Sequence, residues 1–232
     1  MRLHVGTSGY SYAEWKGTFY PEGMPAAKML AYYAERFETV EINATFYRMP
    51  RPSMFEKWMA QVPESFLFAL KAPQRITHMK KLADVGDDVR YFFNVAATLG
   101  PRLGPLLFQL PPFAHKDVEK LRAFLAILPP GPRVAMEFRH DSWCDNEVYG
   151  VLRERDIALC LSDTDEVADP AALVVPTASW GYLRLRRTEY AAGMLAEWRE
   201  RIEAQPWDQA FVFFKHEDEG KGPQFAREFR GA

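Results

Sequence analysis

Ionisable and amide side chains gather where we predict buried strands to end. The carboxylates among them are Glu41, Glu137 and Asp163, and the other groups are Thr7, Ser8, Asn43, Lys71, Gln109, Arg139, His140, Arg184, Arg186, Lys215 and His216. The carboxyl ends of parallel strands meet on one face, so these groups would surround one site. Carboxylates and a lysine there suit acid/base catalysis, and arginines hold phosphate or carboxylate through paired N–H donors. The predicted catalytic residues are Glu41, Lys71, Glu137 and Asp163.

Three pairs of these side chains are two residues apart: Glu41 with Asn43, Glu137 with Arg139, and Arg184 with Arg186. Because side chains alternate along a strand, the members of each pair share a face. The alternative to a functional site is an internal salt-bridge network in which Glu41 and Glu137 neutralise Lys71 and an arginine. Buried ionic networks stabilise a fold weakly compared with apolar side chains, and perturbed ionisable groups cluster at functional sites. We therefore favour a functional site.

The elements that must position these groups alternate between strand and helix about eight times. The predicted strands cover residues 3–6, 39–43, 66–71, 106–110, 133–139, 157–161, 182–186 and 211–215. Stretches with apolar residues at helical spacing lie between them, but the helical signal between Glu166 and Trp180 is poor because Pro170 and Pro176 interrupt it. The 232 residues give 29 per unit (232/8).

This count predicts an α/β protein with a single (β/α)8 barrel of the TIM type over residues 1–232, with a weak or absent helix after strand six. An open doubly wound sheet is the rival, although such sheets more often stop at five or six strands. No linker or change of composition divides the chain.

Aromatic residues fill the long loop after the first strand. Tyr10, Tyr12 and Trp15 have two interpretations that the sequence leaves open. They close the barrel end as a hydrophobic lid, or they form a stacking platform for a sugar or base. His78 lies in a loop after the third strand that is long enough to reach the same face.

Composition limits the partners. The chain has 29 Lys and Arg residues against 31 acidic residues, a net charge of −2 and a pI of about 6.2. This balance argues against a broad surface for nucleic acid or an anionic membrane. There is no apolar run of membrane-spanning length and no leader-like start, and two cysteines are too few for a disulfide scaffold. We expect a cytoplasmic protein without a membrane partner.

Several motifs are similar to those of a known family. They are Gly6-Thr-Ser-Gly-Tyr-Ser-Tyr12, Val40-Glu-Ile-Asn-Ala-Thr-Phe-Tyr47, Lys71-Ala-Pro73, Thr77-His78, Gln109-Leu-Pro-Pro112, Glu137-Phe-Arg-His140, Ser142-Trp143, Asp163 and Tyr182-Leu-Arg184. Together they resemble the YecE-like family, also called domain of unknown function 72. The resemblance implies a TIM-type barrel and a site at these positions, which adds Tyr47 and Trp143 to the predicted ligand-binding residues. It implies no reaction, because no activity is established for the family.

The chain departs from this family pattern at two strands. The family's seventh strand usually runs Arg, any residue, His-Gly, whereas Arg184-Leu is followed here by Arg186-Arg187. Its eighth strand commonly ends in Asn-Asn, and Lys215-His216 stands here instead. The added positive charge is consistent with a divergent or more anionic ligand.

We rank first a protein that binds or acts on a phosphorylated or other anionic small molecule. The anion would be held by Lys71, Arg139, Arg184, Arg186 and Lys215. Glu41 or Glu137 would serve as acid/base, Thr7, Asn43 and Gln109 would orient the substrate, and the aromatic residues of the first loop would cover a ring.

Two alternatives rank lower. One is a divalent-metal hydrolase or isomerase with Glu41, Glu137, Asp163 and His216 as ligands, although nearby cations would repel a metal and no tight ligand motif is present. The other is a non-catalytic module that docks a protein or a nucleic-acid phosphate backbone at the basic face. The sequence identifies no cofactor and leaves protein partners unknown.

Overall fold

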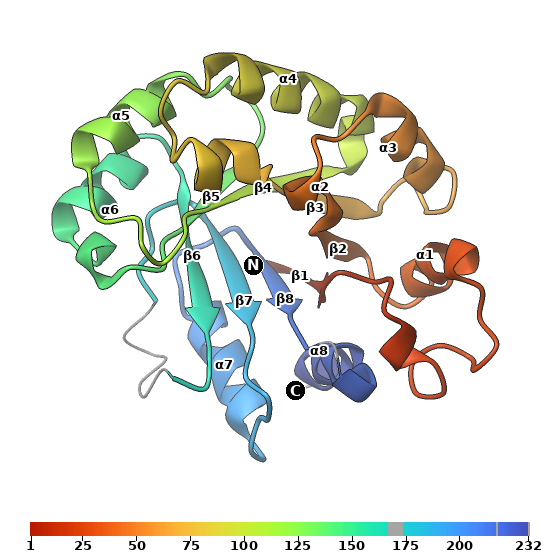
Figure 1. The fold of residues 1–232 in the computed structure, drawn as a ribbon. Helices are drawn as coiled ribbons and strands as arrows, with labels where there is room; N and C mark the ends of the chain where they lie inside the picture. Colours follow the sequence, from red (N-terminus) through yellow and green to blue (C-terminus); the bar gives the residue numbers. More distant parts are fainter. Residues whose placement is uncertain (167–173, 217, 232) are drawn as a thin grey trace.

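Eight parallel strands, each hydrogen-bonded to the next along the chain, form the centre of the molecule (Figure 1). The computed structural model describes residues 1–166, 174–216 and 218–231. The strands are β1 (Arg2–Ser8), β2 (Thr39–Ile42), β3 (Leu67–Lys71), β4 (Leu103–Gln109), β5 (Val134–Glu137), β6 (Ala158–Asp163), β7 (Trp180–Leu185) and β8 (Gln209–Phe214). β8 also pairs with β1, so the sheet closes. The predicted (β/α)8 barrel is confirmed, and the open doubly wound sheet is wrong because such a sheet has two free edges.

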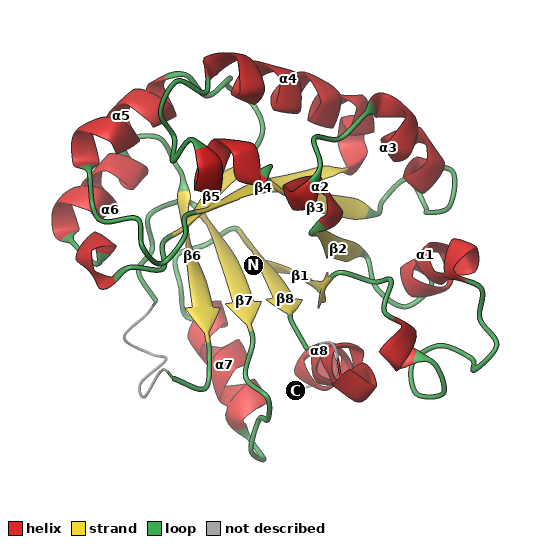
Figure 2. Cartoon of the chain, viewed as in Figure 1, coloured by secondary structure: helices red, strands yellow, loops and turns green. Residues whose placement is uncertain are grey.

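Helices follow most of the strands, and all of them except the four-residue α2 lie around the outside of the barrel (Figure 2). They are α1 (Ala26–Ala34), α2 (Ala44–Tyr47), α3 (Pro52–Met59), α4 (Gly86–Ala96), α5 (Val118–Ala126), α6 (Asn146–Arg153), α7 (Met194–Glu203) and α8 (Lys221–Gly231). The four-residue α2 follows β2 at once and packs against β3. Among the helices of the described residues, none combines the length and apolar character that crossing a bilayer requires.

The connection from β6 to β7 contains no helix in its described parts, residues 164–166 and 174–179. Residues 167–173, where part of the prediction of a weak or absent helix falls, lie outside the described residues. Some predicted strands were also too long, because β5, β7 and β8 end at Glu137, Leu185 and Phe214. The side chains of Arg139, Arg186 and Lys215 therefore project from the loops that follow these strands.

Two apolar layers, one on each side of the sheet, explain why the strands read as nearly continuous apolar runs. In β4, for example, Leu106 and Phe108 pack in the core beneath the helices, whereas Leu107 lies in the separate cluster inside the barrel. That interior cluster comprises Ala69, Leu107, Ala135, Ala158, Cys160, Trp180, Tyr182, Phe211 and Phe213. It fills the barrel as a packed core rather than a pore.

Polar side chains occupy the next inward position beyond this apolar cluster. Because side chains alternate along a strand, a residue two places after an inward one also points inward. Ala69 is thus followed by Lys71, Leu107 by Gln109, Ala135 by Glu137, Cys160 by Ser162 and Tyr182 by Arg184. The barrel consequently carries an apolar plug with a polar layer at the carboxyl ends of the strands.

Candidate functional site

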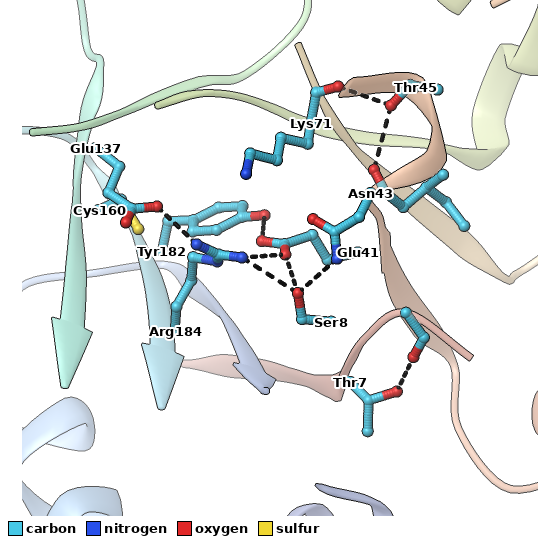
Figure 3. A network of polar contacts seen from close by, with 12 residues as sticks. Thr7, Ser8, Glu41, Asn43, Thr45, Lys71, Glu137, Cys160, Tyr182 and Arg184 are labelled. Carbon is cyan, nitrogen blue, oxygen red and sulfur yellow. Dashed lines mark hydrogen bonds and ion pairs between the residues drawn. The ribbon is translucent and has the colours of Figure 1, made fainter. Parts of the chain in front are cut away.

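Arg184 is the centre of the polar layer (Figure 3). Its guanidinium donates from Nη2 to Glu41 Oε1 at 3.0 Å and from Nη1 to Glu137 Oε2 at 2.9 Å. Nη2 also lies 3.2 Å from Ser8 Oγ. Glu41 and Glu137 are 0% exposed and Arg184 is 1% exposed, so all three charges are withdrawn from water. The arginine thereby joins three strands that are distant in sequence, β2, β5 and β7.

The Glu41 carboxylate has partners on both oxygens. Tyr182 donates its hydroxyl to Oε2 at 2.7 Å, and the Ser8 hydroxyl donates to Oε1. Asn43 in turn donates from Nδ2 to Ser8 Oγ at 2.9 Å. Burial and the Glu41 charge raise the pKa of Tyr182 well above its ordinary value, so this hydroxyl remains a donor. A carboxylate supplied with this many donors is held in a single orientation.

Glu137 is held ionised by its neighbours. Burial disfavours the charged form, but Arg184 and Arg139 outweigh it and hold the pKa of Glu137 at about 2. Arg139 donates from Nε to Glu137 Oε1 at 3.2 Å, and its side chain is 34% exposed at the rim. Burial opposes the charge of Arg184 as well, yet Glu41 and Glu137 raise its pKa well above the ordinary value. Glu137 and Arg184 therefore stay charged at neutral pH.

Lys71 differs from these paired groups. Its side chain is half-buried, and its amine lies 4.2 Å from the centre of the Phe46 ring, on α2. Figure 3 shows the amine directed toward Glu41, Arg184 and Glu137. Within the described residues no carboxylate lies at ion-pair distance from it. Burial and then the charge of Arg184 lower the pKa of Lys71 to about 8, although Glu41 and Glu137 act in the opposite direction.

Three buried polar atoms in this layer have no hydrogen-bond partner within the described residues: Ser162 Oγ, Arg184 Nε and Arg186 Nε. Ser162 stands opposite Arg184 in the β6–β7 register. Gln109 stands opposite Glu137 in β4–β5, and a hydrogen bond from its side chain helps to lower the pKa of that carboxyl. The two arginine atoms are hydrogen-bond donors, and the Ser162 hydroxyl can donate as well as accept. Buried polar groups in proteins are normally satisfied, so a cluster of exceptions indicates a place where an acceptor binds.

Three predicted site residues point away from this layer. Thr7 faces α1, where its hydroxyl lies 2.9 Å from the Tyr33 hydroxyl. Asp163 lies between the sheet and α7, with Arg187 Nε at 2.7 Å and Trp198 Nε1 at 3.2 Å. The His216 ring faces Phe225 of α8. The prediction of a catalytic Asp163 and of a ligand-orienting Thr7 is corrected, because each is adjacent in sequence to an inward residue and so projects outward.

The same alternation separates the residues proposed as a metal set. Glu41 and Glu137 bind Arg184, whereas Asp163 and His216 lie on the outer side of the sheet. Across residues 1–166, 174–216 and 218–231, no three His, Cys, Asp or Glu side chains are grouped so that they could hold a metal ion. The structure thus gives the metal-hydrolase alternative no site at these four residues.

Two predicted aromatic ligand contacts are buried instead. Trp15 is 1% exposed and packs against Tyr12, Phe19 and Tyr20, which corrects its assignment as a stacking platform and agrees with a hydrophobic lid. Trp143 stacks on Phe138 at 4.3 Å and donates Nε1 to a backbone carbonyl. Both rings have their faces covered by protein.

The remaining candidates lie near the rim. Tyr10 is partly buried near Tyr33, and the Tyr12 hydroxyl donates to the Ser8 carbonyl at 2.8 Å. Tyr47 is 73% exposed. The His78 ring contacts Phe46, and the His140 ring contacts His115. Burial and, to a smaller extent, the Lys71 charge lower the pKa of His78. Lys215 follows β8, where its backbone N–H donates to the Leu185 carbonyl.

Sequence reasoning missed Tyr182 and Ser162. Tyr182 lies two residues before Arg184, and Ser162 stands opposite Arg184 on the neighbouring strand. Because Tyr182 and Arg184 are two residues apart in β7, their side chains share a face of the strand. The expectation that Arg184 points inward was therefore the signal that could have identified Tyr182. Ser162 needed the β6–β7 register, which only the paired sheet provides.

We expect Tyr182→Phe to lower the free energy of unfolding by about 1–3 kcal/mol, because Glu41 Oε2 would lose its donor while remaining buried. Urea denaturation measures this. Tyr91→Phe is the matched control: its hydroxyl donates to the Pro50 carbonyl at 3.3 Å, and the residue is 45% exposed. Equal, small effects of the two substitutions would contradict the role assigned to Tyr182.

Comparison with known proteins agrees with the resemblance noted in the sequence. The chain is 30% identical over 139 residues to UPF0759 protein YecE of Escherichia coli K12, covering 60% of this chain and 48% of that protein. It is 29% identical over 156 residues to UPF0759 protein YunF of Bacillus subtilis 168, covering 63% and 54%. The chain thus spans about half the length of these curated relatives.

Solved structures match over nearly the whole chain. A DUF72 family protein from Thermotoga maritima MSB8 superposes with a TM-score of 0.85 and 28% identity, over 100% of this chain and 98% of that one. One from Enterococcus faecalis V583 has a TM-score of 0.75 at 17% identity, over 99% and 96%, and supports the fold alone. The family profile described as "Protein of unknown function DUF72" matches residues 4–232. The chain therefore belongs to the DUF72 family.

Proposed function

We propose that the carboxyl-terminal end of the barrel binds a small molecule carrying a phosphate or carboxylate group and acts on it by acid/base chemistry. One observation carries the proposal: the unpartnered buried atoms of Ser162, Arg184 and Arg186 can all donate a hydrogen bond, and they lie in one layer. An anion supplies several acceptor oxygens at once and would satisfy them together.

The charges of the layer favour the same ligand. Glu41 and Glu137 carry two negative charges, whereas Lys71, Arg139, Arg184 and Arg186 are four cationic groups within electrostatic reach of them. Burial and the neighbouring Arg184 charge lower the pKa of Arg186, so the protein pays a cost for keeping this cation there. A bound anion would relieve the repulsion between the two arginines.

Lys71 is the group best suited to exchange a proton. A general acid or base works most efficiently when its pKa lies near the working pH. Lys71, at about 8, meets this condition, whereas Glu137, at about 2, remains ionised throughout the neutral range. We therefore infer that Lys71 exchanges the proton and that Glu137 holds Arg184 and Arg139 in place.

Arg186→Met tests the anion site. Inorganic phosphate at constant ionic strength should raise the melting temperature of the unsubstituted protein by mass action. Loss of one charge-assisted hydrogen bond, about 1.5–3 kcal/mol, should weaken phosphate binding about 10–100-fold in Arg186→Met. Without phosphate the variant should be at least as stable as the parent, because removing Arg186 removes its repulsion with Arg184.

Arg90→Met is the control, since Arg90 is 71% exposed and pairs only with Asp87 on the surface of α4 within the described residues. It should bind phosphate as the parent does. Phosphate titrations, monitored by thermal unfolding and by calorimetry, measure phosphate binding by the parent and the two variants. Absence of stabilisation by about 10 mM phosphate, or equal binding by Arg186→Met and the parent, would refute the anion site.

A further inference from the structure

The position of the Lys71 side chain suits a nucleophile as well as a cation that binds an anion. It is the last residue of β3, its side chain enters the polar layer from the inward face, and its amine contacts the Phe46 ring rather than a carboxylate. Three charged side chains beside it, Glu41, Glu137 and Arg184, are locked to one another. The amine is thus near the proposed anion donors while remaining outside the hydrogen-bonded ion network of the described residues.

We propose that Lys71 forms an imine with an aldehyde or ketone that carries a phosphate or carboxylate group. The inference rests on the proposed function for recognition of the anionic group, and it adds the carbonyl as the reacting group of the substrate. The donors of Ser162, Arg184 and Arg186 would hold the anion while Lys71 meets the carbonyl carbon.

The step balances without an oxidant or reductant. The neutral Lys71 amine adds through its lone pair to the carbonyl carbon, and a C–N bond forms as the C=O π bond opens to oxygen. The two amine protons are transferred to that oxygen, which leaves as water, and the C=N bond forms. Protonation of the imine nitrogen gives a cation, which Glu41 and Glu137 would stabilise because both lie within electrostatic reach of Lys71.

Its surroundings make Lys71 more reactive than an exposed lysine. At about pH 7.5, an amine with a pKa of about 8 has a neutral fraction on the order of 200-fold larger than one with the ordinary value of 10.5. Desolvated lysines next to another cation are the type that forms Schiff bases in enzymes. Lys80 is an internal comparison, because its ammonium pairs with Asp88 at 2.9 Å.

Borohydride trapping tests the inference on the full chain. The protein is incubated with pyridoxal phosphate, an aldehyde with a phosphate group, reduced with sodium borohydride, and digested for peptide mass spectrometry. We expect Lys71 to be labelled at least about tenfold faster than Lys80. Pyridoxal, which lacks the phosphate, should label Lys71 more slowly, and inorganic phosphate should compete with pyridoxal phosphate. Lys71→Arg keeps the cation and should still be stabilised by phosphate while losing the label at this position.

The outcomes separate the two proposals. If phosphate raises the melting temperature but Lys71 is unlabelled, or is labelled no faster than Lys80, the imine is refuted and the anion site stands. If pyridoxal and its phosphate label Lys71 at equal rates and phosphate gives no protection, the nucleophile stands and the anion site is refuted. Preferential, phosphate-sensitive labelling of Lys71 supports both.

Discussion

Arg184→Met is expected to lower the free energy of unfolding by about 3–5 kcal/mol at neutral pH. The substitution keeps much of the side-chain volume but leaves Glu41 and Glu137 buried, with their shared guanidinium removed. An uncompensated buried carboxylate is among the costliest defects in a folded protein. Chemical denaturation of the variant and the parent at neutral pH measures the difference.

Two further variants test whether this loss of stability comes from the uncompensated buried carboxylates. Arg90→Met removes an exposed surface ion pair and should change stability by less than about 1 kcal/mol. The triple variant Glu41→Gln, Arg184→Met, Glu137→Gln removes all three charges and should regain much of the stability that Arg184→Met loses, because no uncompensated charge stays buried. An Arg184→Met protein as stable as the parent would show that the two carboxylates do not depend on this arginine.

The second large effect is a loss of stability in acid that depends on Glu137. The pKa of this carboxyl is lowered from its ordinary 4.5 to about 2 in the folded protein. A lowered folded-state pKa gives stability that is fully present above the unfolded value and is lost as the pH falls through the folded value. The difference of about 2.5 units corresponds to about 3 kcal/mol, present at pH 6 and mostly gone near pH 2.

Comparison with Glu137→Gln isolates this contribution from those of other carboxyls. The difference in unfolding free energy between the parent and the variant should be largest above about pH 5 and should shrink as the pH falls toward 2. Urea denaturation at a series of pH values, in a buffer of constant ionic strength, provides the measurement. A difference that stays constant with pH would mean that Glu137 has the same pKa in the folded and unfolded protein.

The ion network and the unpartnered donors have different consequences for function. The contacts among Glu41, Arg184 and Glu137 are complete without a ligand, so they are compatible with the purely structural network considered from the sequence. The donors of Ser162 and Arg186 are not needed for that network and have no acceptor within the described residues. These donors distinguish an anion site from a purely structural ion network. Arg186 is therefore the preferred residue for testing anion binding.

The amino-acid sequence was sufficient to predict the barrel, and it nominated three residues that the structure brings together in the polar layer. Eight strand-like segments separated by mostly helical ones predicted the closed sheet, and their ends marked Glu41, Glu137 and Arg184. It also placed Lys71 correctly, as the last residue of its strand. These predictions succeeded because strand period and helix spacing are local properties of the chain, which residue patterns report directly.

Only the tertiary structure decided which of two neighbouring residues faces the site. Both surfaces of this sheet are buried, one inside the barrel and one beneath the helices, so apolar residues line both faces and the sequence does not mark the inner one. In the closed barrel, Ser8 and Ser162 face the interior, whereas their neighbours Thr7 and Asp163 face the helices. It also brought Tyr182 to Glu41, 141 residues earlier in the chain, a contact set by strand register around the closed barrel rather than by any local pattern.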